Sequence, residues 1–80
     1  MATEAAMTQL ERRGFTVTRR KWGFAAALGD GVINVTDFGS GSFDGCMVSR
    51  KGADEHPASD WFADIFAPNL RRALRMLGVK

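Results

Sequence analysis

The chain has 80 residues and a mass of 8.7 kDa, which allows one modest hydrophobic core and leaves no room for two domains. Hydrophobic residues make up 45% of it, charged residues 25%, and the net charge is +2, so the composition is that of a globular domain rather than a disordered one. A single cysteine, Cys46, excludes an intramolecular disulfide, and with one histidine, His56, the chain has too few soft ligands for a structural zinc site. We predict one domain over residues 1–80 that needs no metal and no cofactor.

No stretch of the sequence is apolar for long enough to cross a membrane. The longest run of small and apolar residues, Gly23 to Gly29, is far shorter than the roughly 18 to 20 residues that a bilayer requires. The first residues also lack the basic region and following hydrophobic stretch of a secretion signal. We therefore predict a protein without a membrane partner and with a cytoplasmic location.

The first element in chain order is a short helix over about residues 3 to 13. Thr3 is the predicted N-cap, and Gly14 stands where a left-handed residue ends a helix. One narrow apolar stripe faces the core, formed by residues at spacings of three and four: Ala6, Met7 and Leu10.

After Gly14 the hydrophobic pattern changes to the alternation of strands. Phe15 and Val17 begin a first strand, and a second strand from Trp22 to Leu28 places alternate residues on one face. The pair Asp30-Gly31 predicts a tight hairpin turn. A third strand, Val32 to Phe38, and a fourth strand, about Phe43 to Ser49, follow. Turns this short join antiparallel neighbours, so the middle of the chain is a meander of three to four strands.

The last part of the chain predicts a helix that is bent at Pro68. A polar connection, Arg50 to Pro57, leads to a helix that begins at Ser59 or Asp60. The residues of this helix that face the core are Trp61, Phe62, Ile65 and Phe66. Asn69 caps the continuation, whose apolar face consists of Leu70, Ala73, Leu74 and Leu77 and which ends at Gly78. The predicted fold is therefore α+β: a short N-terminal helix, an antiparallel meander and a bent C-terminal helix packed on the sheet.

Charge is distributed unevenly along the chain. Residues 1–21 sum to +3, residues 22–70 to −5 and residues 71–80 to +4. If the two ends lie on one side of the sheet, they form a basic face beside an acidic belt, and such a field attracts an oppositely charged partner. The candidate basic residues are Arg19, Arg20, Lys21, Arg71, Arg72 and Arg75, and the candidate acidic residues are Asp37, Asp44, Asp54 and Asp60. The alternative interpretation is that these charged residues form ordinary solvent-exposed faces that bind no partner.

No group of residues predicts a catalytic site. Cys46 and His56 could form a nucleophile and its base, but no third residue that would orient the base is evident nearby. A lone cysteine in the middle of a strand is usually a small buried hydrophobic residue. Asp54, Glu55 and His56 have the types of metal ligands, but neighbours on one loop rarely converge on a single ion. We therefore predict no enzymatic activity and no metal.

Two aromatic residues of the second strand have two possible roles. Trp22 and Phe24 lie two residues apart and share a face of a strand. If that face is under the helices, both belong to the core. If it is the other face, they form an exposed aromatic platform for a partner or a nucleic-acid base.

Two stretches of the sequence resemble parts of the HicA-type mRNA interferase toxins, which have the fold of double-stranded-RNA-binding domains. They are Leu10 to Lys21 (LERRGFTVTRRK) and Asn69 to Val79 (NLRRALRMLGV), and the order of helix, strands and helix is also that of the fold. The resemblance implies an RNA-binding surface. It does not extend to ribonuclease activity, because the family's catalytic histidine follows the first strand and Lys21 to Phe24 contains none. The family also has lysines at the start of its last helix, where this chain has Asp60 and Asp64.

In its general type the chain is similar to small phage and mobile-element proteins that inhibit host defence complexes, including anti-CRISPR proteins. The likeness lies in a compact single domain with a short helix, a meander and a closing helix opened by Asp60-Trp61-Phe62. It implies binding to a large protein or nucleoprotein target without catalysis.

Two functions follow from these features, and the sequence leaves both open. The first is a non-enzymatic interaction module whose partner is a protein or a nucleoprotein complex. The second is an RNA- or DNA-binding domain that uses the basic face, with an affinity that falls steeply as salt rises. The sequence does not specify an oligomeric state.

Overall fold

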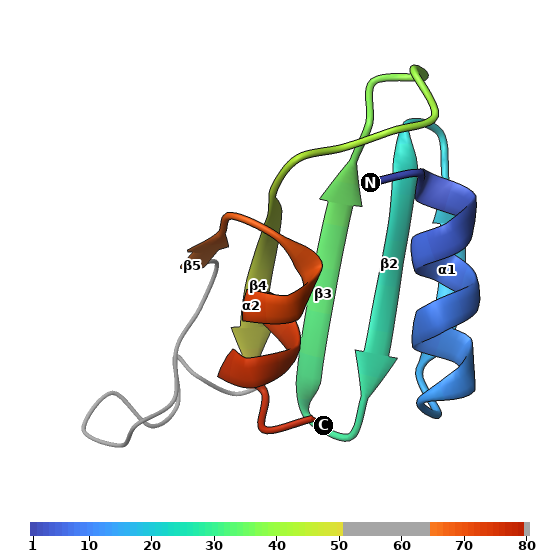
Figure 1. The fold of residues 1–80 in the computed structure, drawn as a ribbon. Helices are drawn as coiled ribbons and strands as arrows, with labels where there is room; N and C mark the ends of the chain where they lie inside the picture. The colour runs from blue at the N-terminus through green and yellow to red at the C-terminus, as the bar shows by residue number, and fades with distance from the viewer. Residues whose placement is uncertain (51–64, 80) are drawn as a thin grey trace.

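The computed structural model describes residues 1–50 and 65–79. These residues form two helices and five strands, which Figure 1 shows in chain order: α1 (Thr3–Arg12), β1 (Thr16–Arg20), β2 (Gly23–Leu28), β3 (Gly31–Thr36), β4 (Cys46–Arg50), β5 (Ile65–Ala67) and α2 (Leu70–Met76).

The strands form one antiparallel sheet in the order β1-β2-β3-β4-β5, so neighbours in the sequence are neighbours in space. The register pairs Val17 with Ala26, and pairs Ile33 both with Ala26 and with Val48. The predicted α+β fold with an antiparallel meander is confirmed. The sheet formed by the described residues has five strands, rather than the three or four that the sequence predicts.

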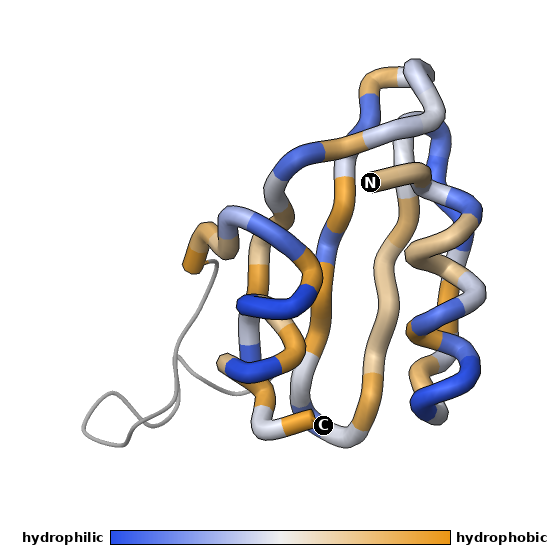
Figure 2. Tube along the Cα trace, viewed as in Figure 1, coloured by the Kyte–Doolittle hydropathy of each residue, from blue (hydrophilic) through white to orange (hydrophobic). Residues whose placement is uncertain are grey.

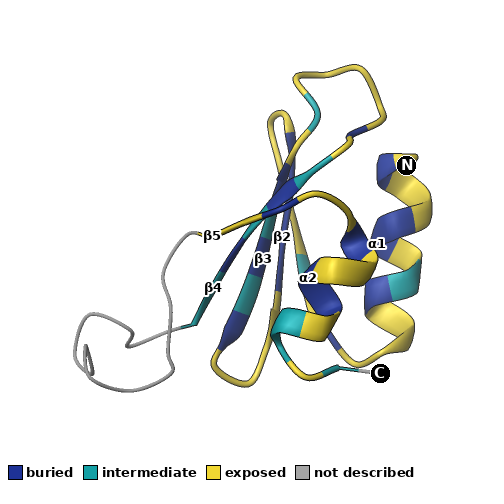
Figure 3. Ribbon diagram, turned by 60° about the vertical axis from the view of Figure 1, so that its left-hand side comes forward, coloured by how far each residue is buried: buried dark blue, intermediate teal, exposed yellow. Residues whose placement is uncertain are grey.

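Both helices lie on the same face of the sheet. Figure 3 shows the sheet nearly edge-on, with α1 and α2 on one side. α1 packs over β1 and β2, and α2 packs over β4 and β5. The core lies between the helices and the sheet. Alternate residues of the three inner strands point into it: Phe24, Ala26, Ile33, Val35, Cys46 and Val48. Neither described helix has the length and apolar character needed to cross a membrane.

The C-terminal end of α1 agrees with the sequence prediction, and the N-terminal end differs from it. Gly14 adopts the left-handed conformation, with φ +94°, and the backbone N–H of Phe15 donates to the Leu10 carbonyl at 3.0 Å, as in a Schellman C-cap. Thr3 is not the N-cap, because Ala2 occupies that position and makes no side-chain cap. The Thr3 hydroxyl instead donates to Asp37 Oδ2 at 2.7 Å, which ties the start of α1 to the loop after β3.

The hairpin between β2 and β3 turns one residue earlier than predicted. Leu28 pairs with Gly31, so the two loop residues are Gly29 and Asp30 rather than Asp30 and Gly31. Gly29 has φ +60° and Asp30 has a negative φ, the combination that a type II′ turn requires. Gly31 belongs to β3, and its lack of a side chain leaves room for Leu77, whose Cδ2 would lie 2.8 Å from an added Cβ.

The segment before Pro68 is a strand where the sequence predicts a helix. Ile65 to Ala67 form β5, which pairs with β4 from Cys46 to Val48. Proline disfavours the helical conformation of the residue before it, so Ala67 is extended. Ala67 is buried, while Ile65 and Phe66 are exposed. The bent helix is therefore wrong over these three residues. Ser59, Asp60, Trp61 and Phe62 lie outside the described residues.

The helix after Pro68 follows its prediction closely. The side chain of Asn69 accepts a hydrogen bond from the backbone N–H of Arg72 at 2.8 Å, which is a standard N-cap. Leu70, Ala73 and Leu74 are buried against the sheet. Gly78, with φ +73°, follows the end of the helix.

Candidate functional site

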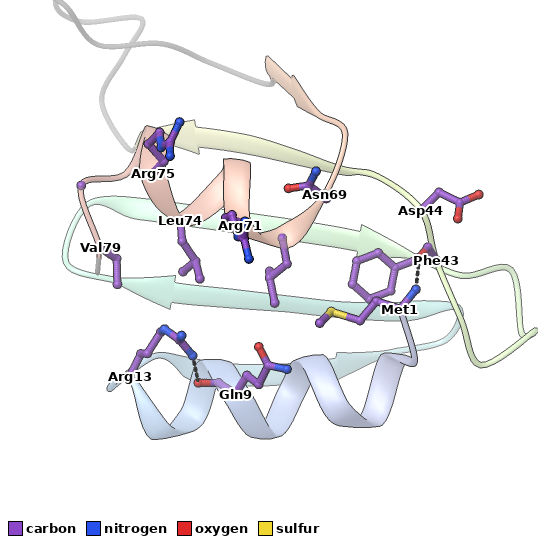
Figure 4. A pocket seen from close by; sticks show the side chains of 12 residues that line it. Met1, Gln9, Arg13, Phe43, Asp44, Asn69, Arg71, Leu74, Arg75 and Val79 are labelled. Carbon is purple, nitrogen blue, oxygen red and sulfur yellow. Dashed lines mark hydrogen bonds between the residues drawn. The ribbon is translucent and has the colours of Figure 1, made fainter.

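The two helices leave an open groove between them, with a volume of about 850 Å³. Figure 4 shows Gln9 on α1 and Arg13 directly after it, along one wall of the groove, and Arg71, Leu74 and Arg75 on α2, along the other. The rest of the lining consists of Met1, Phe43, Asp44, Asn69, Leu70, Gly78 and Val79. We call this feature the interhelical groove. It exists because α1 covers one edge of the sheet and α2 covers the other edge.

The deeper part of the interhelical groove is apolar. Phe43, Leu70 and Leu74 line it and are themselves almost completely buried in the core. The Phe43 ring also packs edge-on against Phe24, with ring centroids 6.3 Å apart. The backbone carbonyl of Phe43 accepts a hydrogen bond from the N-terminal ammonium of Met1 at 2.8 Å, which fixes one end of the groove. Because these side chains are anchored in the core, the floor of the groove is preformed, and Met1 and Val79 supply the more exposed apolar atoms of its lining.

The rim of the interhelical groove is basic. Arg13 follows α1, and Arg71 and Arg75 lie one helical turn apart on α2. All three are exposed. Arg13 Nη1 donates to the Gln9 carbonyl at 3.2 Å, and within residues 1–50 and 65–79 no carboxylate forms an ion pair with any of the three. Figure 2 shows hydrophilic bands at the end of α1 and on α2. The groove therefore offers apolar surface flanked by uncompensated positive charge.

The predicted basic residues divide into two groups. Arg71 and Arg75 line the interhelical groove, while Arg72 is exposed on α2 outside it. Arg19 and Arg20 end β1, at the sheet edge opposite the one that α2 covers. The helices thus share one face of the sheet, but these arginines of the two chain ends do not form a single cluster.

Arg19 differs from its neighbours because it has an ion-pair partner. Its Nη2 lies 2.6 Å from Glu4 Oε1, on α1. Both side chains are well exposed, so the pair contributes little to stability. Its main effect is to neutralise one of the positive charges at that edge.

Arg13 is the basic residue of the groove lining that the sequence prediction missed. In the sequence it suits only the negative end of the first helix. The fold places it across the interhelical groove from Arg71 and Arg75. The sequence feature that could have indicated a role for Arg13 is the pair of arginines before Gly14, but this pair does not predict which element of the fold faces it.

The predicted acidic residues are also dispersed. Asp44 is exposed at one end of the interhelical groove. Asp37 lies in the loop after β3, where the Thr3 hydroxyl and then the backbone N–H of Gly39 hold the pKa of its carboxyl below the usual value of 3.8. Asp54 and Asp60 lie outside the described residues, so the acidic belt remains a prediction.

Cys46 is a core residue. It is buried in β4, and this burial raises the pKa of its thiol, which disfavours the reactive thiolate. His56, the other member of the candidate catalytic pair, lies outside the described residues. Among residues 1–50 and 65–79, no group of three histidine, cysteine or acidic side chains is placed to hold a metal ion.

The two aromatic residues of the second predicted strand have different roles. Phe24 is completely buried in the core. Trp22 precedes β2 in the turn from β1 and is half exposed, beside the exposed ring of Phe38. The sequence treats the two residues as a pair on one face, but only Phe24 belongs to the strand.

Comparisons of the chain with protein-family models, with curated proteins and with solved structures find no match. The resemblances to HicA-type toxins and to anti-CRISPR-type inhibitors therefore stay predictions.

Proposed function

We propose that this chain is a non-enzymatic binding module, and that its interhelical groove binds an acidic, partly apolar segment of a protein partner. The observation that carries the proposal is the position of three arginines without ion-pair partners in the described structure around an apolar groove. An apolar side chain of the partner would enter the groove, and carboxylates beside it would meet the guanidinium groups. Arginine suits this role because its planar guanidinium binds a carboxylate through two parallel hydrogen bonds.

The apolar surface favours a protein over a nucleic acid as the occupant of this groove. Phosphate contacts require cations, but they gain nothing from Phe43, Leu70 and Leu74. Asp44, at one end of the groove, repels any anion, so we expect the carboxylates of the partner to lie at the end that carries Arg13, Arg71 and Arg75. A protein segment with one large apolar residue matches both parts of the site.

Selection from a displayed library of random peptides tests this proposal directly. Peptides that bind the immobilised protein should share an apolar residue flanked by Asp or Glu. Replacing Arg71 and Arg75 together by glutamine should weaken binding of the selected peptide, measured by calorimetry. Two exposed charge pairs are worth about 0.4 to 2 kcal/mol, which is roughly a 2- to 30-fold loss.

Arg72→Gln is the matched control, because Arg72 is exposed on the same helix but does not line the groove. Its affinity for the selected peptide should equal that of the unmodified protein. The proposal fails if selection enriches no acidic peptides, or if Arg72→Gln weakens binding as much as the double substitution does.

A further inference from the structure

A second surface feature lies at the sheet end that carries the β1–β2 turn and the loop after β3 (Figure 1). Trp22 stands in that turn and Phe38 in that loop, and the backbone N–H of Asp37 donates to the Trp22 carbonyl at 2.7 Å. This hydrogen bond holds the two segments side by side. The rings have centroids 6.3 Å apart and planes inclined by 43°. We call Lys21, Trp22 and Phe38 the aromatic tip.

The fold presents these rings to solvent at a cost to its own stability. Phe38 is 77% exposed and Trp22 is 50% exposed. Phe38 is also the one non-glycine among the described residues with a positive φ, +54°, a conformation that is unfavourable for a bulky side chain. Glycine would adopt this backbone freely, as Gly39 and Gly41 do nearby. An aromatic ring held in solvent on a strained backbone indicates a surface that binds something.

Positive charge accompanies the rings. The Lys21 ammonium lies over the Trp22 ring, 5.1 Å from its centroid. Arg20 precedes it and is exposed, and in the described part of the chain neither residue has an ion-pair partner. Asp37 precedes Phe38 and keeps its negative charge, because its carboxylate accepts hydrogen bonds from the Thr3 hydroxyl and the Gly39 N–H. Arg20, Lys21 and Asp37 together sum to +1. The aromatic tip and the neighbouring Arg20 therefore combine exposed ring surface with a net positive charge.

We propose that the aromatic tip binds single-stranded nucleic acid, with bases stacked on Phe38 and Trp22 and phosphates at Lys21 and Arg20. Aromatic stacking with adjacent cations is the general mode of single-strand binding, and it tolerates any sequence because every base has a π-face. A duplex would not fit this surface, because its bases are stacked on each other and only their edges are accessible. The residues involved are separate from those of the interhelical groove.

Binding of a labelled ten-nucleotide oligo(dT) to the full chain, measured by fluorescence anisotropy, tests the proposal. The oligonucleotide should bind more tightly than the duplex that it forms with oligo(dA). Phe38→Gly should weaken binding about 5- to 150-fold, the loss expected for one stacked base. This variant also relieves the backbone strain, so its melting temperature should be unchanged or higher, and misfolding would not explain the loss.

Two further variants give the test its controls. Lys21→Gln should reduce the slope of log affinity against log salt by about 0.7, the value for one phosphate contact with a single strand. Phe66→Ala removes a ring that is 62% exposed on β5, at the opposite edge of the sheet, and should leave oligonucleotide affinity unchanged.

Several results would overturn the proposal. They are an affinity that Phe38→Gly leaves unchanged, tighter binding of the duplex, no binding of oligo(dT) even at low salt, and a loss on Phe66→Ala as large as that on Phe38→Gly. Binding to vesicles of phosphatidylserine and phosphatidylcholine without binding to oligo(dT) would indicate a lipid surface instead. The double substitution of Arg71 and Arg75 should leave oligonucleotide binding intact, so a failure here is distinct from a failure at the interhelical groove.

Discussion

Among the glycines that the structure describes, Gly23 is the one at which the fold should tolerate a side chain least. It begins β2 with φ +148°, and a Cβ built there would overlap the carbonyl oxygen of Val35 and lie 2.8 Å from its carbonyl carbon. The obstructing atoms belong to the backbone of β3, in the middle of the sheet, so no side-chain rotation relieves them. Gly23→Ala would have to separate the two strands where Phe24 pairs with Val35.

Two costs contribute to the expected loss of stability. The positive φ alone costs a residue with a Cβ about 1 to 2 kcal/mol. Separating the strands also displaces Phe24, which is completely buried, and loss of a buried phenyl contact costs up to about 3 to 5 kcal/mol. We expect Gly23→Ala to lower the free energy of unfolding by about 3 to 5 kcal/mol. A domain of this size has a total stability of about 4 to 12 kcal/mol.

Thermal unfolding followed by circular dichroism measures this loss, and Gly41→Ala is the matched control. Gly41 has φ +83°, but a Cβ there would meet nothing within 4 Å. The control should lose only about 1 to 2 kcal/mol, the cost of the positive φ, and its melting temperature should fall by about 4 to 16 °C. Gly23→Ala should lower the melting temperature by more than the control does, by about 12 to 40 °C. Equal melting temperatures for the two variants would refute the close approach of Gly23 to β3.

Three smaller predictions concern single groups. Asn69→Ala removes the N-cap of α2 and should cost about 1 kcal/mol in urea unfolding, whereas Asn69→Asp should cost less, and equal losses would contradict the cap. Thr3→Val should raise the pKa of Asp37 toward 3.8, measured by NMR titration. Because the folded protein holds this pKa low, stability should fall as the pH drops below 3.8, and this acid-induced fall should be smaller in Thr3→Val. Cys46 should react with a thiol reagent only after unfolding, and rapid labelling of the native protein would show that it is accessible.

Local patterns in the sequence predict most of the core. Alternation places Phe24, Ile33 and Val48 on one face of the sheet, and helical spacing places Leu10 and Leu74 opposite them. The same reasoning fails for β5, because the spacing of Ile65 and Phe66 to their neighbours also fits a helix. What decides this segment is pairing with the edge of β4, which is a long-range interaction.

The candidate sites depend on contacts that no local pattern contains. Arg13 belongs to the interhelical groove only because α2 lies across from it. Phe38 appears in the sequence as the last residue of a strand, whereas the structure ends β3 at Thr36 and turns the chain through a positive φ at Phe38. Propensity does not predict a left-handed phenylalanine, so the exposed ring becomes visible only in the fold.

The composition of β1 has a consequence for self-association. As an edge strand, it presents backbone groups that could pair with a strand of another molecule. It is only five residues long and ends in Arg20, which has no ion-pair partner among the described residues and would repel the same residue of a second molecule if two such edges approached. This charge disfavours edge-to-edge pairing, and a neutral residue in place of Arg20 would favour aggregation even with the fold unchanged.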